Sequence, residues 1–165
     1  MQAMVLSIIG KDRPGLIKEI SQCVTQANGN WLQSRFCHLS GQFAGFVEVM
    51  LPLDQHEALV KACQDIESLN ITLAPAELST TERTQTLNIV VTGNDRQGIV
   101  SDISQTLSNM NVSIEEMETT CTSAPNWGSP IFTTKMFLAC QQETDIDEVK
   151  EALEQITDDL VVEFL

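Results

Sequence analysis

The chain has 165 residues, of which 42% are hydrophobic, and a formal net charge of −14. The composition fits an ordered globular protein, and the charge disfavours direct binding to the phosphate backbone of a nucleic acid. No apolar run approaches the ~18 residues of a membrane-spanning helix, and Met1 leads into a strand pattern without a basic leader. We therefore expect a soluble, cytoplasmic protein without a membrane or nucleic-acid partner.

The first half begins with a strand and a helix. Residues 3–9 are dominated by Val, Leu and Ile and predict a central strand. Pro14 suits the first turn of the helix that follows, and Gly29 is predicted to end that helix as its C-cap. The apolar stripe of this helix has spacings of three and four residues and consists of Leu16, Ile17, Ile20, Val24 and Ala27.

The rest of the first half predicts a hairpin, a second helix and a last strand. The hairpin turn is expected at Ser40-Gly41, and Pro75 restricts the last strand to an edge of the sheet. The order of elements is then strand, helix, strand, strand, helix, strand. The two hairpin strands are predicted over residues 30–39 and 42–51. The second helix is predicted from residue 54 or 56 to 69, and the last strand over residues 71–78.

The second half repeats this order, so the sequence predicts two domains, residues 1–79 and 85–165, joined by a linker at 80–84. Its second helix has an acidic outer face, which is either solvated or a docking surface for a basic partner. Its hairpin contains a longer connection, from Cys121 to Ser129, whose Trp127 either folds back on the sheet or awaits a partner. In chain order, the strand, helix, two hairpin strands, helix and last strand of this half are predicted over residues 85–92, 99–110, 112–122, 131–140, 146–156 and 160–165.

Five cysteines are spaced far apart, and none belongs to a Cys-x-x-Cys motif. An odd number at such spacings argues against a disulfide framework and a structural zinc site. Four of them lie in apolar helix or strand patterns and are predicted to be buried free thiols, namely Cys23, Cys37, Cys63 and Cys140.

One stretch occurs twice at an offset of 83 residues, each time between a predicted strand and a predicted helix. The first copy is Gly-Lys-Asp-Arg-Pro-Gly-Leu at residues 10–16, and the second is Gly-Asn-Asp-Arg-Gln-Gly-Ile at residues 93–99. The same offset aligns Ile20 with Ile103 and Asn28 with Asn111. A repeat of this length is a whole small domain, because solenoid units have periods of 20–50 residues.

This loop suits a zwitterionic ligand. Gly15 and Gly98 would let a ligand approach the backbone, and the first helical N–H groups attract a carboxylate. Asp12 and Asp95 could accept hydrogen bonds from an ammonium group. Two alternatives stay open: the aspartates could cap the helices, and the glycines could serve helix–strand packing alone. The arginines at 13 and 96 are expected to pair with acidic side chains, or else to bind a ligand carboxylate.

The order of elements and the Gly-x-Asp-Arg-Pro-Gly-Leu loop resemble the ACT domain, a regulatory module that binds amino acids. Two such units over this length look like the glycine cleavage system transcriptional repressor family. The second loop departs from the pattern because Gln97 replaces the usual proline. The resemblance implies an α+β fold of two ferredoxin-like sandwiches, each a four-stranded antiparallel sheet with both helices on one face. It also implies that units pair through edge strands, hold ligands at the interface between them and form a homodimer.

The resemblance further implies a small amino acid, glycine or serine, as effector, and a protein partner such as a DNA-binding activator. In that family a polar residue just after the first helix of a unit often contacts the ligand. The matching positions in this chain are Asn30 and Ser113. Alternatives are an ACT scaffold that binds no ligand and a regulatory subunit of a metabolic enzyme. An enzyme is not expected, because the chain has two histidines and no nucleotide or nucleophile motif. The candidate ligand-binding residues are Asp12, Arg13, Pro14, Gly15, Leu16, Asn30, Asn94, Asp95, Arg96, Gln97, Gly98, Ile99 and Ser113.

Overall fold

A computed structural model describes residues 1–67, 69–77, 85–123, 128–141 and 144–165, and the chain divides into two compact units, residues 1–78 and 79–165. The predicted linker and Trp127 lie outside the described residues. The first unit contains β1 (Gln2–Lys11), α1 (Leu16–Gln26), β2 (Asn30–Leu39), β3 (Gln42–Leu51), a short 3-10 helix (Leu53–Gln55), α2 (His56–Gln64) and β4 (Leu69–Pro75). The second contains β5 (Gln85–Asn94), α3 (Ile99–Asn109), β6 (Ser113–Thr122), β7 (Ile131–Cys140), α4 (Ile146–Glu154) and β8 (Val161–Phe164).

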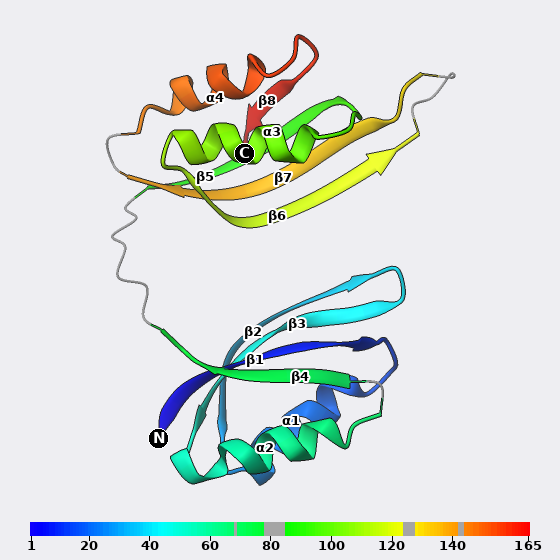
Figure 1. Cartoon of the computed structure of the whole chain (residues 1–165), viewed down its shortest axis with the longest axis vertical. Coiled ribbons are helices and arrows are strands. Elements are labelled where there is room, and N and C mark those ends of the chain that lie inside the picture. Colours follow the sequence, from blue (N-terminus) through cyan, green and yellow to red (C-terminus); the bar gives the residue numbers. More distant parts are fainter. Residues whose placement is uncertain (68, 78–84, 124–127, 142–143) are drawn as a thin grey trace. The chain divides into compact units, whose positions relative to one another are not determined.

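Each unit is a four-stranded antiparallel sheet with two helices on one face (Figure 1). The strand orders are β2-β3-β1-β4 and β6-β7-β5-β8, so β1 and β5 lie inside their sheets, and β4 is an edge strand. These observations confirm the predicted fold class, two ferredoxin-like sandwiches. None of the helices in the described part of the chain is long and apolar enough to cross a membrane.

The two cores follow from the periods of the strands and helices. Alternate residues of β1, including Leu6 and Ile8, point to the helices and meet the stripe of α1 that contains Ile20. In the second unit, Ile89 of β5 and Ile103 of α3 take the corresponding places. Each such side chain, once fully buried, stabilises the fold by roughly 1.5–3 kcal/mol before the entropic cost of ordering it.

Both first helices end in the same way, and the predicted cap at Gly29 is wrong. Asn28 and Asn111 adopt the left-handed conformation, with φ of 53° and 56°. The N–H of Gly29 then donates to the carbonyl of Val24 at 2.9 Å, which completes a Schellman motif. Gly29 is required for space instead, because an added Cβ would lie 2.6 Å from the Cδ2 of Leu51.

Two predicted boundaries in the first unit also need correction. Helix α2 ends at Gln64 and not at residue 69, because β4 already begins at Leu69. The error arises because Ile66, which follows the helix, is still buried in the core and continues its apolar period. Strand β4 begins two residues earlier than predicted and ends at Pro75.

The hairpin and three of the four thiol predictions are confirmed. Leu39 pairs with Gln42 across a two-residue turn in which Ser40 and Gly41 both have positive φ, as that turn requires. All five cysteines are free, and Cys23, Cys63 and Cys140 are buried. Cys37 is exposed, against expectation, because it lies on the sheet face that the helices leave uncovered.

Candidate functional site

The repeated loop has the same backbone geometry in both units. Gly15 and Gly98 precede the first residues of α1 and α3, with φ of 90° and 86°. Their carbonyls accept from the N–H groups of Glu19 and Asp102 at 3.1 and 3.0 Å. Nothing lies within 4 Å of a Cβ added at either glycine, so the idea that they serve packing alone is wrong. They are required because their backbone conformation is costly for other residues.

The backbone beyond each glycine is suited to a negatively charged group. The first N–H groups of a helix have no acceptor within it, and the helix dipole places partial positive charge there. Neither α1 nor α3 has a side-chain N-cap, so Asp12 and Asp95 do not cap these helices and that alternative is wrong. Their carboxylates are exposed beside the loop instead.

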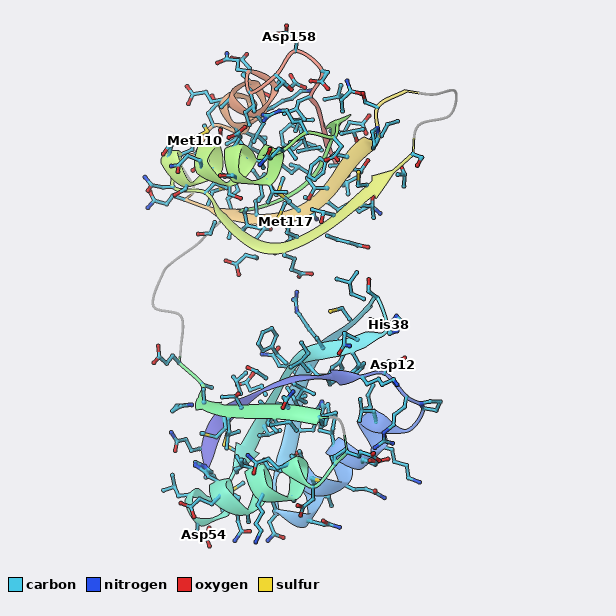
Figure 2. The ribbon with its side chains drawn as sticks, turned by 45° about the vertical axis from the view of Figure 1, so that its right-hand side comes forward. Asp12, His38, Asp54, Met110, Met117 and Asp158 are labelled. Carbon is cyan, nitrogen blue, oxygen red and sulfur yellow. The ribbon has the colours of Figure 1, made fainter. Side chains whose placement is uncertain are left out.

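In the first unit the loop carboxylate lies against a histidine of β2. The Nε2 of His38 is 3.4 Å from the Oδ2 of Asp12, and both side chains are about half exposed (Figure 2). The backbone N–H of Asp12 donates to the carbonyl of Gly41 at 3.1 Å, which fixes the loop against the β2–β3 turn. An ammonium group at this position would therefore meet Asp12 together with His38.

In the second unit a cysteine replaces that histidine. His38 and Cys121 lie opposite Phe43 and Phe132 in the two sheets, so they occupy equivalent positions. Local desolvation, followed by a hydrogen bond to Asp95 and its charge, raises the pKa of the Cys121 thiol. Neither His38 nor Cys121 was predicted from the sequence as a neighbour of the loop. The 83-residue offset aligns His38 with Cys121. Because the first and second strands of a unit run in the same direction, this alignment would have indicated that both residues lie near the loop.

The arginine of each loop pairs with an acidic residue in the following helix, as one of the two interpretations predicted. Arg13 donates to both carboxylate oxygens of Glu19 at 2.6 Å, and these hydrogen bonds lower the pKa of Glu19. Arg96 donates once to Asp102, also at 2.6 Å. A ligand carboxylate would have to compete with these acids for either arginine.

The second loop has an additional attachment at its start. The N–H of Asn94 donates to the Oδ2 of Asp159 at 2.7 Å, and the hydroxyl of Thr157 donates to its other oxygen at 2.6 Å. The Thr157 hydroxyl and then the Asn94 N–H hold the pKa of Asp159 below its usual range. This connection ties the end of β5 to the segment that leads into β8.

Asn30 and Ser113 lie far from the loop of their own unit. Asn30 pairs with Met50, which pairs with Ala3 at the other end of β1 from the loop. Lys11 lies eight positions beyond Ala3 along the strand, and this is a length of about 26 Å. The same register separates Ser113 from the second loop, where Ser113 instead lines a hollow of about 410 Å³. One ligand cannot touch both groups within a single unit.

The other candidate residues differ in what they can offer a ligand. Pro14 and Gln97 are exposed in the loops, whereas Leu16 and Ile99 are buried in the cores and present only their backbone. Among the residues that the structure describes, no group of three or more His, Cys, Asp or Glu side chains could hold a metal ion. The chemistry at each loop is therefore that of a carboxylate, the N–H groups at the start of a helix and a neighbouring strand residue.

Comparisons with known proteins agree with this description. Sequence profiles of the ACT domain match residues 2–72 and residues 81–162. A crystal structure of an unknown protein from Galdieria sulphuraria is 26% identical, with a TM-score of 0.82 over 99% of this chain and 98% of that one. A protein assigned provisionally as a glycine cleavage system transcriptional repressor is 18% identical, with a TM-score of 0.70 over 99% and 97% of the two chains. No curated protein matches the sequence.

Proposed function

The chain belongs to the ACT domain family, with one domain in each half, and from this premise we propose that it senses a small amino acid and acts through a protein partner. ACT domains are regulatory modules that bind amino acids, so a regulatory role is the general expectation. The finer proposal is that the ligand binds at the repeated loops, and that glycine or serine is the ligand.

One observation supports the loops as the site: each loop brings together groups that favour an anion and a group that favours a cation. The N–H groups that follow Gly15 and Gly98 favour a carboxylate, whereas Asp12 and Asp95 favour an ammonium group. These aspartates have no capping role that would explain them. An α-amino acid presents both groups on one carbon, and its carboxylate and ammonium can be satisfied together.

The proposed ligand is small because the loops offer little apolar surface of their own. The apolar side chains that follow the glycines, Leu16 and Ile99, face the cores and are almost fully buried. Asn30 and Ser113 would contact a ligand only when another ACT unit lies alongside, in the pairing that is typical of the family. We place them in the assembled site for this reason.

The proposed partner is a protein, with a DNA-binding activator as the specific candidate. A net charge of −14 disfavours direct binding to DNA, so control of transcription would have to pass through another chain. The tandem layout, shared over the full length with the provisional repressor, supports this role. Restraint of the activator, released or imposed by the amino acid, is the proposed mechanism.

Isothermal calorimetry against the twenty amino acids, preceded by a thermal-shift screen, tests the proposal. A ligand at 100 times its Kd stabilises the native state by about 2.7 kcal/mol, which is readily detected. We expect one or two small amino acids to bind, and Asp12→Ala and Asp95→Ala to weaken binding about tenfold or more. Neither substitution removes a helix cap, so stability without ligand should stay within about 0.5 kcal/mol of the wild type.

Asp54→Ala is a suitable matched control, because Asp54 is also exposed but lies outside the loops. No binding by any amino acid would contradict the sensor and favour an ACT scaffold. Binding that survives in the double variant, Asp12→Ala with Asp95→Ala, would place the site elsewhere. Co-purification with a metabolic enzyme instead of a DNA-binding protein would identify the chain as an enzyme's regulatory subunit.

A further inference from the structure

The helices cover one face of each sheet and leave the other face open (Figure 1). On the open face of the first unit, alternation along the strands places Val5 and Ile9 of β1 beside Ala44 and Phe46 of β3. Phe46 is 59% exposed and Ile9 is 51% exposed. Large apolar side chains gathered at the centre of an exposed face mark an interaction surface.

The second unit shows that the fold does not require apolar residues at these positions. Met4 pairs with Val49 and Leu87 pairs with Leu138, which aligns β1 with β5 and β3 with β7. The equivalents of Val5, Ile9, Ala44 and Phe46 are then all polar. Two half-buried positions change in the opposite direction, where Val90 and Phe137 replace Ser7 and Glu48. The four polar equivalents are Asn88, Thr92, Thr133 and Lys135.

The open face of the first unit also differs in charge from the rest of the chain. Its charged side chains on the three strands β1, β2 and β3 are Lys11, Arg35 and Glu48, whereas the whole chain has a net charge of −14. Two copies that approach each other through most other surfaces would therefore repel each other. This face can meet its own equivalent with little electrostatic cost.

This face combines an exposed aromatic side chain with a neighbouring hollow. A shallow hollow of about 280 Å³ lies beside the projecting Phe46, and Val5, Arg35 and Glu48 contribute to its lining. A two-fold axis through such a patch places the aromatic ring of each copy at the hollow of the other. Aromatic side chains seated in hollows at the centre of an interface contribute most to its affinity.

We propose that two copies of this chain associate through the open face of the first unit's sheet, around a two-fold axis near Phe46. Four strands spaced by ~4.8 Å and ~30 Å long give a face on the order of 600 Å² per copy. Two such faces reach the lower limit of specific interfaces, roughly 1,200 Å², so the association is reversible. The edge strands β2 and β4 stay free, so pairing through edges is compatible with it.

Sedimentation velocity of the full chain from about 1 to 200 µM tests the proposal, with Phe46→Lys as the main variant. Lysine occupies the equivalent position in the second unit, so the fold tolerates it, and circular dichroism checks this. The expected result is concentration-dependent association of the wild type that weakens at least about 100-fold in the variant. Ile17→Lys is the matched control, since Ile17 is 47% exposed but lies on α1, and it should associate like the wild type.

The thiol of Cys37 provides a second measurement, which can be made on the wild type without any substitution that could disturb the fold. Cys37 lies opposite Ala44 on the same open face and is exposed in the single chain. Its alkylation should slow as wild-type concentration rises, and stay fast at all concentrations in Phe46→Lys. A wild type that is monomeric throughout this range, or a Phe46→Lys protein that associates unchanged, would overturn the proposal. The amino-acid calorimetry is independent of either result.

Discussion

The two loops share their backbone but differ in the side chains around it. In the first unit Asp12 lies beside His38, and nothing described links Lys11, which begins the loop, to the segment before β4. In the second unit Asp95 lies beside Cys121, and Asp159 holds Asn94 in place. The glycine conformation and the helix start are thus the common requirement, whereas the neighbouring groups are free to change. We therefore expect the two proposed sites to bind an amino acid with different affinity.

The two cores also differ at one aligned, buried position, where the first unit has a cysteine and the second a leucine. The largest predicted effect is on the reactivity of this cysteine. Cys63 in the first core is fully buried, and the aligned residue in the second core is Leu153, also fully buried. Burial, followed by the neighbouring Cys23 thiol, raises the pKa of Cys63 to about 12. At pH 8 its reactive thiolate should therefore be roughly 1,000-fold rarer than that of an ordinary thiol.

Alkylation of the dilute protein at pH 8, followed by mass spectrometry, measures this difference. Cys37 should react first, and Cys121 more slowly because its pKa is raised. Cys63 should react at least about 1,000-fold more slowly than Cys37. In denaturant all five thiols should react at similar rates. Equal labelling of Cys37 and Cys63 in the folded protein would show that the first core is open.

The next largest effect concerns the residue that follows each left-handed asparagine. Val112 occupies this place in the second unit, whereas Gly29 in the first lies against Leu51 and Val24. Gly29→Ala should cost about 1–3 kcal/mol of the free energy of unfolding, because the new methyl group overpacks a closed core. Urea denaturation of the full chain measures this loss.

Asn28→Gly is the matched control for that substitution. It alters the adjacent residue, whose positive φ glycine adopts without strain, so stability should change by less than about 0.5 kcal/mol. A loss in Asn28→Gly as large as that in Gly29→Ala would mean that the asparagine side chain stabilises the helix end. The difference between the two units would then lie elsewhere.

The sequence was sufficient for the elements whose pattern is local and repeated. Strands β2, β3 and β7 begin and end where alternation and turn residues predicted them. The repeat also predicted that Gly15 and Gly98 have equivalent roles, and both have positive φ in the structure. The resemblance to the ACT domain implied four-stranded antiparallel sheets with both helices on one face, and the structure confirms this.

The remaining features depend on contacts across the sheet, which a linear pattern does not encode. Gly29 was expected to supply a positive φ, but the packing of Leu51 against it requires its lack of a side chain. Cys37 belongs to a strand-like run, but the pairing of β2 with β3 turns its side chain to the uncovered face. The distance between Asn30 and the loop likewise results from strand direction, not from spacing in the chain.

A smaller effect is expected from the attachment that only the second loop has. Asp159→Ala removes the acceptor for the Asn94 N–H, so hydrogen exchange at that amide should accelerate a few-fold. Asp158→Ala is the control, because the neighbouring carboxylate is exposed and should leave exchange unchanged. The pKa of Asp159 is lowered, so this carboxylate protects the Asn94 amide from exchange fully at pH values above the ordinary aspartate pKa. The protection disappears as pH falls through the native pKa of Asp159. Equal exchange in both variants would mean that this hydrogen bond does not hold the loop.

The smallest effect concerns the arginine pairs, which differ in geometry between the units. Arg13 contacts both oxygens of Glu19, whereas Arg96 contacts one oxygen of Asp102. Nuclear magnetic resonance titration of Glu19 should show a pKa below its ordinary range, and Arg13→Ala should raise it toward that range. A lowered carboxyl pKa stabilises the fold above the unfolded value, about 4.3, and this stabilisation is lost as pH falls through the native value. Because each side chain is still more than a third exposed, Arg13→Ala should leave the unfolding midpoint at pH 7 almost unchanged. A large loss would show that this pair holds the loop itself.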